Sequence, residues 1–508
     1  MRGLNRFLRA AVVGLPVLFA ASAAEAQSGP PTAEELAAQI NALKQDYEKR
    51  IATLEAQIAA MKAKPAAAGE QAAPASRPSM RTGDNSFNPA IGVVLNSMYS
   101  EYSEDHSGLP GFQLGHHSER PDEGLALGHS ELTMSGNIDD KFRGNLTLGL
   151  GAHGSETELD LEEAYIQTLA GSGMPDGVRL KAGRALWTFG YLNEHHAHGD
   201  DFSDRPLPYR AFLDGGYNDD GLELSVVLPG DLYKEVGGGV FRGDDMPFGG
   251  SESGREAWSA YARIGGDVGS NSALRLGAYV LDGASHGRSG GGHDHAHEDE
   301  HGHGDEHAHD DEDGEDHAED EHGDEHDEHG HGHAEYFSEG MFTGDTRLFG
   351  VDFRYTWAPT GNARDSELIL QGEYFRRSEE GDYALEGEQH CEVVGHGEEE
   401  PSIEEHEHNC HTDEEVKAFK GDANGWYAQA VYKFLPQWRV GARYSRLSPP
   451  SAAEVDDTST ISAMLDWTNS EFGRVRFQYN REASGDMRDN QLILQYVMSL
   501  GAHAAHSF

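Results

Sequence analysis

The stretch QLILQYVMSLGAHAAHSF, residues 491–508, decides the fold class of this chain. Its apolar side chains at alternate positions are Leu492, Leu494, Tyr496, Met498 and Leu500. A period of two places them on one face of an extended strand. The chain then ends on Phe508, and a terminal aromatic residue after an alternating strand suits a signal for inserting a β-barrel into a membrane.

The same period of two recurs along the chain after Phe87. Sixteen strand candidates carry it, at 91–104, 127–137, 142–152, 159–169, 177–188, 220–228, 235–243, 256–266, 273–283, 345–358, 366–376, 424–434, 437–447, 458–468, 473–482 and 490–500. Their connections alternate between mostly longer loops and short turns such as NIDD, DVGSN and APTGNA. Outer-membrane β-barrels have this asymmetry, whereas a periplasmic β-sandwich would explain the alternation but not sixteen segments with one-sided loops.

We therefore predict an all-β fold over residues 87–508, a transmembrane antiparallel β-barrel of about 16 strands. Several charged residues of mixed sign are expected to face its lumen, namely Arg439, Arg443, Asp466, Arg474 and Arg476. An even strand count places both ends of the barrel on the periplasmic side. The histidines then collect in the outward loops, since none of the short turns contains one.

The amino-acid composition limits the classes of binding partner that this chain can have. The chain has 89 acidic and 39 basic residues and a formal net charge of -50. Nucleic acid is excluded, because binding phosphate requires a basic surface, and the acidic balance favours cations. Only 37% of the residues are hydrophobic, and no internal apolar run is long enough for a spanning helix. This composition is compatible with a membrane β-barrel, because only every second residue of its strands faces the lipid and has to be apolar.

The first 86 residues predict three segments. Basic residues, an apolar run and Ala-Glu-Ala make 1–26 a signal peptide, so we expect a chain exported to the outer membrane of a Gram-negative bacterium. Residues 32–64 have coiled-coil spacing and predict a helix. It serves a homo-oligomer, with a trimer as one expectation, or it lies alone. Residues 65–86, rich in Ala, Pro and Ser, predict a linker.

The connection 284–344 predicts a disordered loop with metal-binding chemistry. Its segment 293–333 contains thirteen histidines interleaved with Asp and Glu, namely His293, His295, His297, His301, His303, His307, His309, His317, His322, His326, His329, His331 and His333. Neutral imidazole and carboxylate are ligands for Zn2+, with Ni2+ and Cu2+ as alternatives, and residues 293–333 contain no soft Cys or Met ligand. The other interpretation is a merely acidic, solvated loop. Whether metal binding serves transport or buffering stays open.

A second candidate lies in YLNEHHAHGDDFSDRPLPYRAFLDGG, residues 191–216. Its potential ligands are Glu194, His195, His196, His198, Asp200 and Asp201. A loop folded into the lumen of a barrel of this size sets its selectivity, so we predict a constriction or relay site. The alternative is an outer loop stiffened by Pro206 and Pro208.

The loop 377–423 predicts a third group, His396, His406 and His408, between Cys391 and Cys410. In an oxidising compartment the two cysteines are expected to form a disulfide that holds these histidines together. Zinc ligation by both thiolates is the alternative.

Together these features resemble Gram-negative outer-membrane porins, in particular the histidine-rich barrels associated with zinc limitation, and more distantly the coiled-coil-bearing trimeric porins. The resemblance is carried by FNPAIGVVLN at 87–96, by 190–213, by the His/Asp/Glu insertion and by the closing LQYVMSLGAHAAHSF. It implies uptake of zinc or a related divalent cation. Related barrels described as TonB-dependent receptors carry a plug domain before 22 strands, whereas this chain offers a helix and a linker.

The sequence thus predicts a passive channel surrounded by outer-membrane lipid, whose outer loops capture Zn2+ or a related ion as cargo and which needs no resident cofactor. One alternative is a surface metal-buffering protein anchored by its barrel, and another is the barrel of an energy-coupled receptor. An enzyme is not expected, because no nucleophile has a convincing Ser/His/Asp setting and the histidines lie in flexible runs.

Overall fold

Antiparallel strands make up almost all of the regular structure. The computed structural model describes residues 89–104, 108–118, 120–153, 156–250, 254–290, 333–393, 408–470 and 472–501. Its strands are β1 (Ala90–Tyr102), β2 (Gly124–Leu127), β3 (Ser130–Asn137), β4 (Phe142–His153), β5 (Glu156–Thr168), β6 (Val178–Leu186), β7 (Asn218–Val227), β8 (Tyr233–Phe241), β9 (Ala257–Asp267), β10 (Ser272–Arg288), β11 (Met341–Trp357), β12 (Glu367–Val393), β13 (His408–Leu435), β14 (Trp438–Ser448), β15 (Thr458–Ser470), β16 (Gly473–Ser484) and β17 (Met487–Gly501). The helices are η1 (His116–Ser118), η2 (Leu192–Glu194), η3 (Ala197–Gly199), α3 (Leu207–Leu213), α4 (His333–Ser338) and η4 (Ser451–Ala453).

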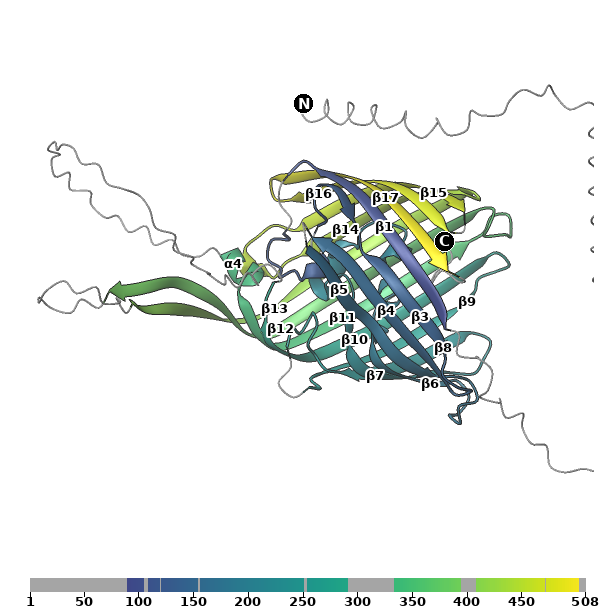
Figure 1. The fold of residues 1–508 in the computed structure, drawn as a ribbon, viewed down its shortest axis with the longest axis horizontal. Coiled ribbons are helices and arrows are strands. Elements are labelled where there is room, and N and C mark those ends of the chain that lie inside the picture. The colour runs from purple at the N-terminus through teal and green to yellow at the C-terminus, as the bar shows by residue number, and fades with distance from the viewer. Residues whose placement is uncertain are drawn as a thin grey trace, which may run out of the picture. The chain divides into compact units, whose positions relative to one another are not determined.

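The strands close into a barrel (Figure 1). From β3 onward each strand pairs with the next, and β17 pairs with β1 through eleven residue pairs, from Gly92 opposite Gly501 to Tyr102 opposite Gln491. The short β2 and β3 pair with successive stretches of β1, so the seventeen strands fill sixteen positions. The predicted antiparallel barrel is confirmed.

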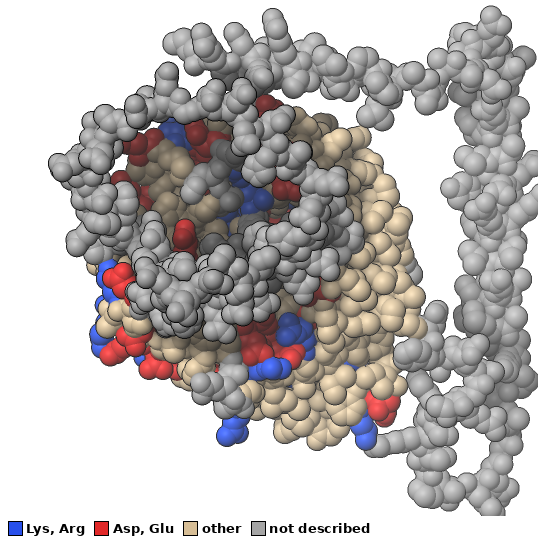
Figure 2. All heavy atoms as spheres, turned by 60° about the vertical axis from the view of Figure 1, so that its left-hand side comes forward, with Lys and Arg blue, Asp and Glu red and all other residues tan. Residues whose placement is uncertain are grey.

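Alternation sorts the side chains between the two faces of the wall. On β15 the exposed Ile461, Leu465 and Trp467 alternate with buried Ser462 and Asp466. Figure 2 shows the result, an outer wall almost free of charged residues around a hollow that contains acidic and basic ones. The lumen-facing residues predicted from the sequence have the expected placement, since Arg443, Arg474 and Arg476 are buried and Arg439 pairs with Asp466.

Several strands run further than the sequence predicted. β12 continues to Val393 and β13 starts at His408, so most of the expected loop 377–423 is a hairpin that projects beyond the barrel (Figure 1). Likewise β10 extends to Arg288 and β11 starts at Met341, which shortens the expected loop 284–344 at both ends. Backbone pairing between neighbouring strands continues past the apolar band because it does not depend on which side chains the strands carry.

Some predictions fall on residues outside those described. They are the signal peptide 1–26, the helix 32–64, the linker 65–86, the terminal Phe508 and most of the histidine-rich loop. Among the helices within the described ranges, none combines the length and the apolar character that crossing a bilayer requires.

The outer face of β17 offers a test of the membrane-facing assignment. Leu494 lies in the middle of β17 with 46% of its surface exposed, and Leu500 lies near the end of the same strand on the same face with 48% exposed. We expect Leu494→Arg to lower the free energy of unfolding in lipid vesicles by about 2–4 kcal/mol, because a charge at the bilayer centre is costly. Leu500→Arg should cost about 1 kcal/mol or less, since the penalty falls toward the interface. Urea titration measures both. Equal effects would place this face outside the bilayer.

Candidate functional site

The segment between β6 and β7 folds into the barrel instead of lying outside it. Residues along it bind the inner wall: Arg476 donates to the Asp200 carbonyl at 2.6 Å, and Arg443 donates to the Asp204 carbonyl at 2.8 Å. Arg476 and Arg443 come from β16 and β14, far along the chain. The loop therefore crosses the lumen, as predicted for a constriction, and we call residues 187–217 the luminal loop.

Local sequence explains how the luminal loop turns. Pro206 precedes α3 and Pro208 lies in its first turn, where the fixed backbone angle of proline suits a helix start and its missing N–H costs nothing. The helix ends at Leu213, and its C-cap residue Asp214 adopts the left-handed conformation at φ 46°. An Asp tolerates this conformation better than most residues with a side chain.

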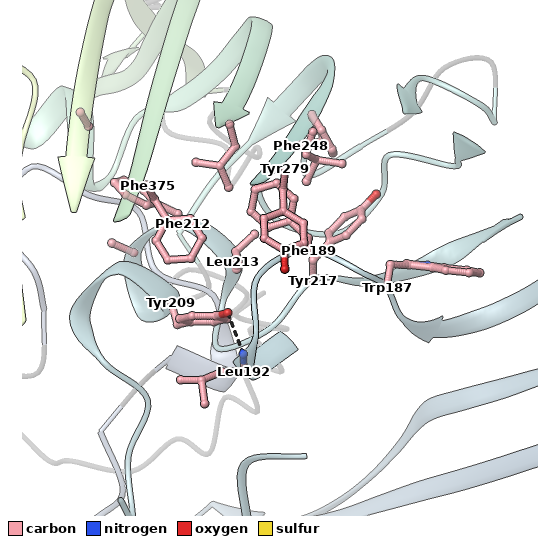
Figure 3. Close-up of a cluster of buried hydrophobic side chains, with 14 of the residues drawn as sticks. Trp187, Phe189, Leu192, Tyr209, Phe212, Leu213, Tyr217, Phe248, Tyr279 and Phe375 are labelled. Atoms are coloured by element: carbon pink, nitrogen blue, oxygen red, sulfur yellow. Dashed lines mark hydrogen bonds between the residues drawn. The ribbon is translucent and has the colours of Figure 1, made fainter. Parts of the chain in front are cut away.

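An aromatic cluster anchors the luminal loop against the wall (Figure 3). Phe189 packs against Tyr279 with ring centroids 5.7 Å apart, and Tyr209 meets Phe375 edge to face at 5.3 Å. Trp187 is 1% exposed and the other four are equally buried. Buried aromatic side chains contribute large apolar area, so the loop is a fixed part of the barrel.

Glu373 of β12 adds polar anchoring at the same place. Its carboxylate accepts hydrogen bonds from the Tyr209 hydroxyl at 3.0 Å, the Tyr427 hydroxyl at 2.6 Å and the backbone N–H groups of Tyr191 and Leu192 at 3.0 and 3.2 Å. Tyr209 in turn accepts from the Leu192 N–H at 3.1 Å (Figure 3). A single wall residue thus satisfies donors from both the first turn of the loop and its helix.

Histidines of the luminal loop meet glutamates of the wall on β3 and β5. His196 Nδ1 lies 3.2 Å from both Glu131 Oε1 and Glu162 Oε2, and its Nε2 lies 3.2 Å from Glu163 Oε2. His198 Nδ1 lies 2.8 Å from the same Glu131 oxygen.

His129, directly before β3, contacts Glu162 as well. We call His129, Glu131, Glu162, Glu163, His196 and His198 the His–Glu cluster.

The backbone of β4 makes room for this cluster. Gly149 stands opposite Glu131 in the ladder, and a Cβ atom there would lie 2.6 Å from the His129 ring. A side chain at 149 would push His129 away from Glu162, so the glycine allows the ring to approach the wall.

The His–Glu cluster has the ligand types of a divalent metal site. Ligand atoms of His129, Glu131 and Glu162 lie within 4.8 Å of one another. Two ligands of a tetrahedral zinc ion, each about 2.0–2.2 Å from it, are about 3–4 Å apart, so small side-chain movements would complete a site. One oxygen of buried Glu131, Oε2, has no hydrogen-bond partner within the described residues.

Charge compensation sets the cluster apart from the rest of the loop. Within the part of the chain that the structure describes, the only ion pairs of Glu131, Glu162 and Glu163 are with histidines. Burial disfavours a charged His196, but Glu131 and its neighbours outweigh this and raise the pKa of His196 well above its ordinary value. A positive charge is therefore favoured at this position.

The other predicted ligands of the loop lie apart from the cluster. Glu194 binds Arg263 at 2.6 Å and Arg275 at 2.7 Å. Burial opposes its charge, but the two guanidinium groups prevail and lower the pKa of Glu194. Arg263 and Arg275 therefore bind the carboxylate of Glu194, which the sequence suggested as a metal ligand.

Asp200, Asp201 and His195 also contact other groups of the protein. Asp200 lies 2.8 Å from Arg205 Nε, yet burial raises its pKa to about 6. Asp201 lies 2.9 Å from Arg439 Nη1. His195 Nδ1 is 3.0 Å from the Tyr191 carbonyl, and burial lowers the pKa of His195. Of the six predicted ligands in this loop, the structure brings only His196 and His198 together.

Four residues of the cluster were missed from the sequence: His129, Glu131, Glu162 and Glu163. One signal was available, because His129 and Glu131 are two residues apart in a strand candidate and so share a face. Their approach to His196 depends on the luminal loop crossing the lumen, which the local sequence does not specify.

The remaining predicted ligands lie on residues whose side chains are not described. His293 to His331, His396 and His406 are outside the described ranges, while the backbones of His333 and His408 belong to α4 and β13. Cys391 stands directly opposite Cys410 in the ladder of β12 and β13. The disulfide between them stays a prediction.

A further histidine, His117, lies close to the His–Glu cluster. His117 on η1 is half exposed, and its Nε2 lies 3.4 Å from Asp160 Oδ2. Its ring is 6.4 Å from that of His129, centroid to centroid. His117 and Asp160 therefore form a second pair of ligand groups, next to the cluster through the contact between the His117 and His129 rings.

A cavity of about 680 Å3 adjoins the cluster on the side of the short turns. Its lining includes Glu163, Glu194 and His196, and also Ser135, Gly136 and Arg143, which lie next to the short turn between β3 and β4. The His–Glu cluster therefore lies between the outer pair His117 and Asp160 and an internal space.

Comparison with known proteins gives the following relatives. No family model matches the chain. An uncharacterized protein of Aquifex aeolicus (strain VF5) is 24% identical over 457 residues, covering 83% of this chain and 80% of that protein.

Solved structures with a similar fold are outer-membrane proteins. The trimer form of OmpT of Vibrio cholerae has a TM-score of 0.44 at 9% identity and covers 81% of this chain and 99% of its own. An anion-selective porin from Comamonas acidovorans has 0.46 at 8%, covering 81% and 99%. The channel DcaP of Acinetobacter baumannii has 0.44 at 11%, covering 81% and 96%.

The chain is an outer-membrane β-barrel. Closure between β1 and β17 leaves no unpaired strand edge to face lipid. Exposed Leu494, Trp467 and Tyr432 belong to its apolar outer face, as a lipid environment requires.

Proposed function

We propose that this barrel is a channel that admits divalent metal cations, with zinc first, and that the His–Glu cluster is where the ion is selected. The observation that carries the proposal is that three wall carboxylates in one place, Glu131, Glu162 and Glu163, have histidine as their only ion-pair partner within the described residues. Elsewhere on the luminal loop carboxylates pair with arginine.

Mixed imidazole and carboxylate ligands suit zinc better than they suit alkali ions or Mg2+, which prefer oxygen alone. The ion is cargo, so each site must also release it. Two neighbouring sites help here, because an ion can pass from His117 and Asp160 to the cluster and then into the cavity beyond. The histidine-rich segment 293–333 would serve as an outer collector that raises the local ion concentration.

The test is the reversal potential of the purified full-length protein in a planar bilayer under a zinc chloride gradient. If the channel passes zinc, the reversal potential has the same sign as the equilibrium potential of Zn2+. If it passes chloride, the reversal potential has the opposite sign, that of the equilibrium potential of chloride, and this result contradicts the proposal. A protein that binds zinc but passes no current would support the surface-buffering alternative instead.

A further inference from the structure

The His–Glu cluster contains more ligand groups than one zinc ion takes. Zinc in proteins is almost always bound by four ligands in a tetrahedral arrangement, whereas the cluster offers three imidazoles and three carboxylates. The contacts within the cluster divide these groups into two sets.

The first set of ligand atoms surrounds His196. Its Nδ1 lies 3.2 Å from both Glu131 Oε1 and Glu162 Oε2, within the spacing of about 3–4 Å between two ligands of one zinc ion. His198 Nδ1 lies 2.8 Å from the same Glu131 oxygen. These two nitrogens and two oxygens make up the number of ligands that a tetrahedral zinc ion takes, and we call them the four-ligand site.

Glu163 orients His196 from the other side of its ring. His196 Nε2 lies 3.2 Å from Glu163 Oε2, and the Asn145 amide donates to the same oxygen at 2.9 Å. A carboxylate that accepts the second N–H of an imidazole fixes the ring and leaves the other nitrogen for a metal ion. Glu163 is therefore a positioning residue of the four-ligand site and not one of its ligands.

The second set uses the remaining oxygens of the same two carboxylates. Glu162 contacts His129 through Oε1, whereas its Oε2 lies near His196. Glu131 is 1% exposed, and its Oε2 has no hydrogen-bond partner among the described residues. Ligand atoms of His129, Glu131 and Glu162 lie within 4.8 Å of one another, and we call them the three-ligand site. Three protein ligands leave a fourth position open for an exchangeable group.

We infer that the His–Glu cluster binds two divalent cations at once, one in each site, with Glu131 and Glu162 bridging them through their separate oxygens. Two metal ions held in one protein site lie about 3.5–4 Å apart, a separation that bridging carboxylates allow. The inference rests on the proposed function, which it deepens from one selected ion to a pair.

The position of the two sites gives the pair a direction. The ring of His129, in the three-ligand site, is 6.4 Å from that of His117. His196, in the four-ligand site, lines the cavity beyond. Two cations this close repel each other, so an ion that enters the three-ligand site lowers the affinity of the four-ligand site for its own ion. A strongly binding site can then release its ion toward the cavity.

Crystals of the full-length protein grown with zinc chloride test the inference, through anomalous scattering measured at the zinc absorption edge. We expect two anomalous peaks at the cluster, about 3.5–4 Å apart. A single peak at saturating zinc would overturn the two-ion inference and leave the proposed function standing. Zinc bound elsewhere on the chain with no peak at the cluster would contradict the proposed function itself.

Single substitutions assign each peak to its ligands. His129→Gln should remove the peak of the three-ligand site and keep the other, whereas His198→Gln should weaken only the peak of the four-ligand site. As a control, His195→Gln changes a histidine of the same loop that contacts the Tyr191 carbonyl and lies outside the cluster, so both peaks should stay. Both peaks persisting in His129→Gln, or either peak disappearing in the control, would overturn the inference.

Zinc block of the potassium current gives a second readout, in a planar bilayer. In the unaltered protein the dwell time of a blocking zinc ion should shorten as the zinc concentration rises, because the next ion displaces the first. In His129→Gln the dwell time should be independent of zinc concentration and at least about tenfold longer at high zinc. A dwell time that does not change with zinc concentration in the unaltered protein would overturn the inference.

Discussion

Replacing Glu131 by Gln should reduce zinc affinity at the luminal site by about 100-fold or more, since even supporting residues of metal ligands contribute about 10–100-fold. One oxygen of Glu131 contacts both His196 at 3.2 Å and His198 at 2.8 Å, so a single substitution removes the charge shared by two imidazoles. Gln has the same shape, which preserves packing against the wall. The zinc-to-potassium permeability ratio should fall by about tenfold if affinity at this point sets selectivity.

Glu223→Gln is the matched control. Glu223 lines the same cavity, and its carboxylate accepts from the Thr188 N–H at 3.2 Å and the Thr188 hydroxyl at 3.0 Å, which an amide can largely reproduce. It removes one luminal charge without touching the cluster, so its permeability ratio should stay close to that of the unaltered protein. Equal losses in the two variants would show that the general negative field of the lumen, and not the cluster, attracts zinc.

Replacing Glu373 by Leu should release the luminal loop and raise single-channel conductance in potassium chloride several-fold. The substitution leaves three donors without their acceptor, the hydroxyls of Tyr209 and Tyr427 and the N–H group of Tyr191, while the Leu192 N–H keeps only the Tyr209 hydroxyl. Each unsatisfied buried donor costs about 1–3 kcal/mol, so the docked state loses much of its advantage. A barrel of sixteen strands emptied of this loop has a water-filled lumen.

Glu373→Gln keeps one acceptor oxygen in the same position and should leave conductance nearly unchanged. Trypsin sensitivity provides a second readout, because Arg210 in the luminal loop is followed by Ala211 and its side chain is only 15% exposed in the docked state. Cleavage there should accelerate in Glu373→Leu only. Unchanged conductance together with resistance to trypsin in Glu373→Leu would show that the aromatic cluster alone holds the loop.

The barrel could be predicted because its signal is local and repeated. Each strand needs only alternation along its own residues, as in Leu494, Tyr496 and Met498, and sixteen such segments with one-sided loops leave few other folds. The strand ends were predicted less well. The hairpin of β12 and β13 continues to Val393 and His408 through backbone pairing, and its polar sequence gives no alternation to read there.

The candidate site was predicted only in part. Local composition identified the luminal loop, and prolines and histidines within residues 190–213 marked it as distinctive. The same composition suggested Glu194, Asp200 and Asp201 as metal ligands, but these carboxylates meet arginines contributed by β9, by the loop itself and by β14. Which acid meets arginine and which meets histidine depends on contacts between residues far apart in the chain.

By itself, therefore, the sequence determined the barrel, its lumen and the loop that carries two of the cluster's histidines, because strand periodicity and turn residues act over short distances. Only the tertiary structure decided that His196 and His198 face Glu131, Glu162 and Glu163. That meeting requires β3 and β5 to lie two positions apart in a closed wall and the luminal loop to cross to them, 67 residues after Glu131 at His198. Side chains so distant in sequence are neighbours only once the barrel has closed around the loop.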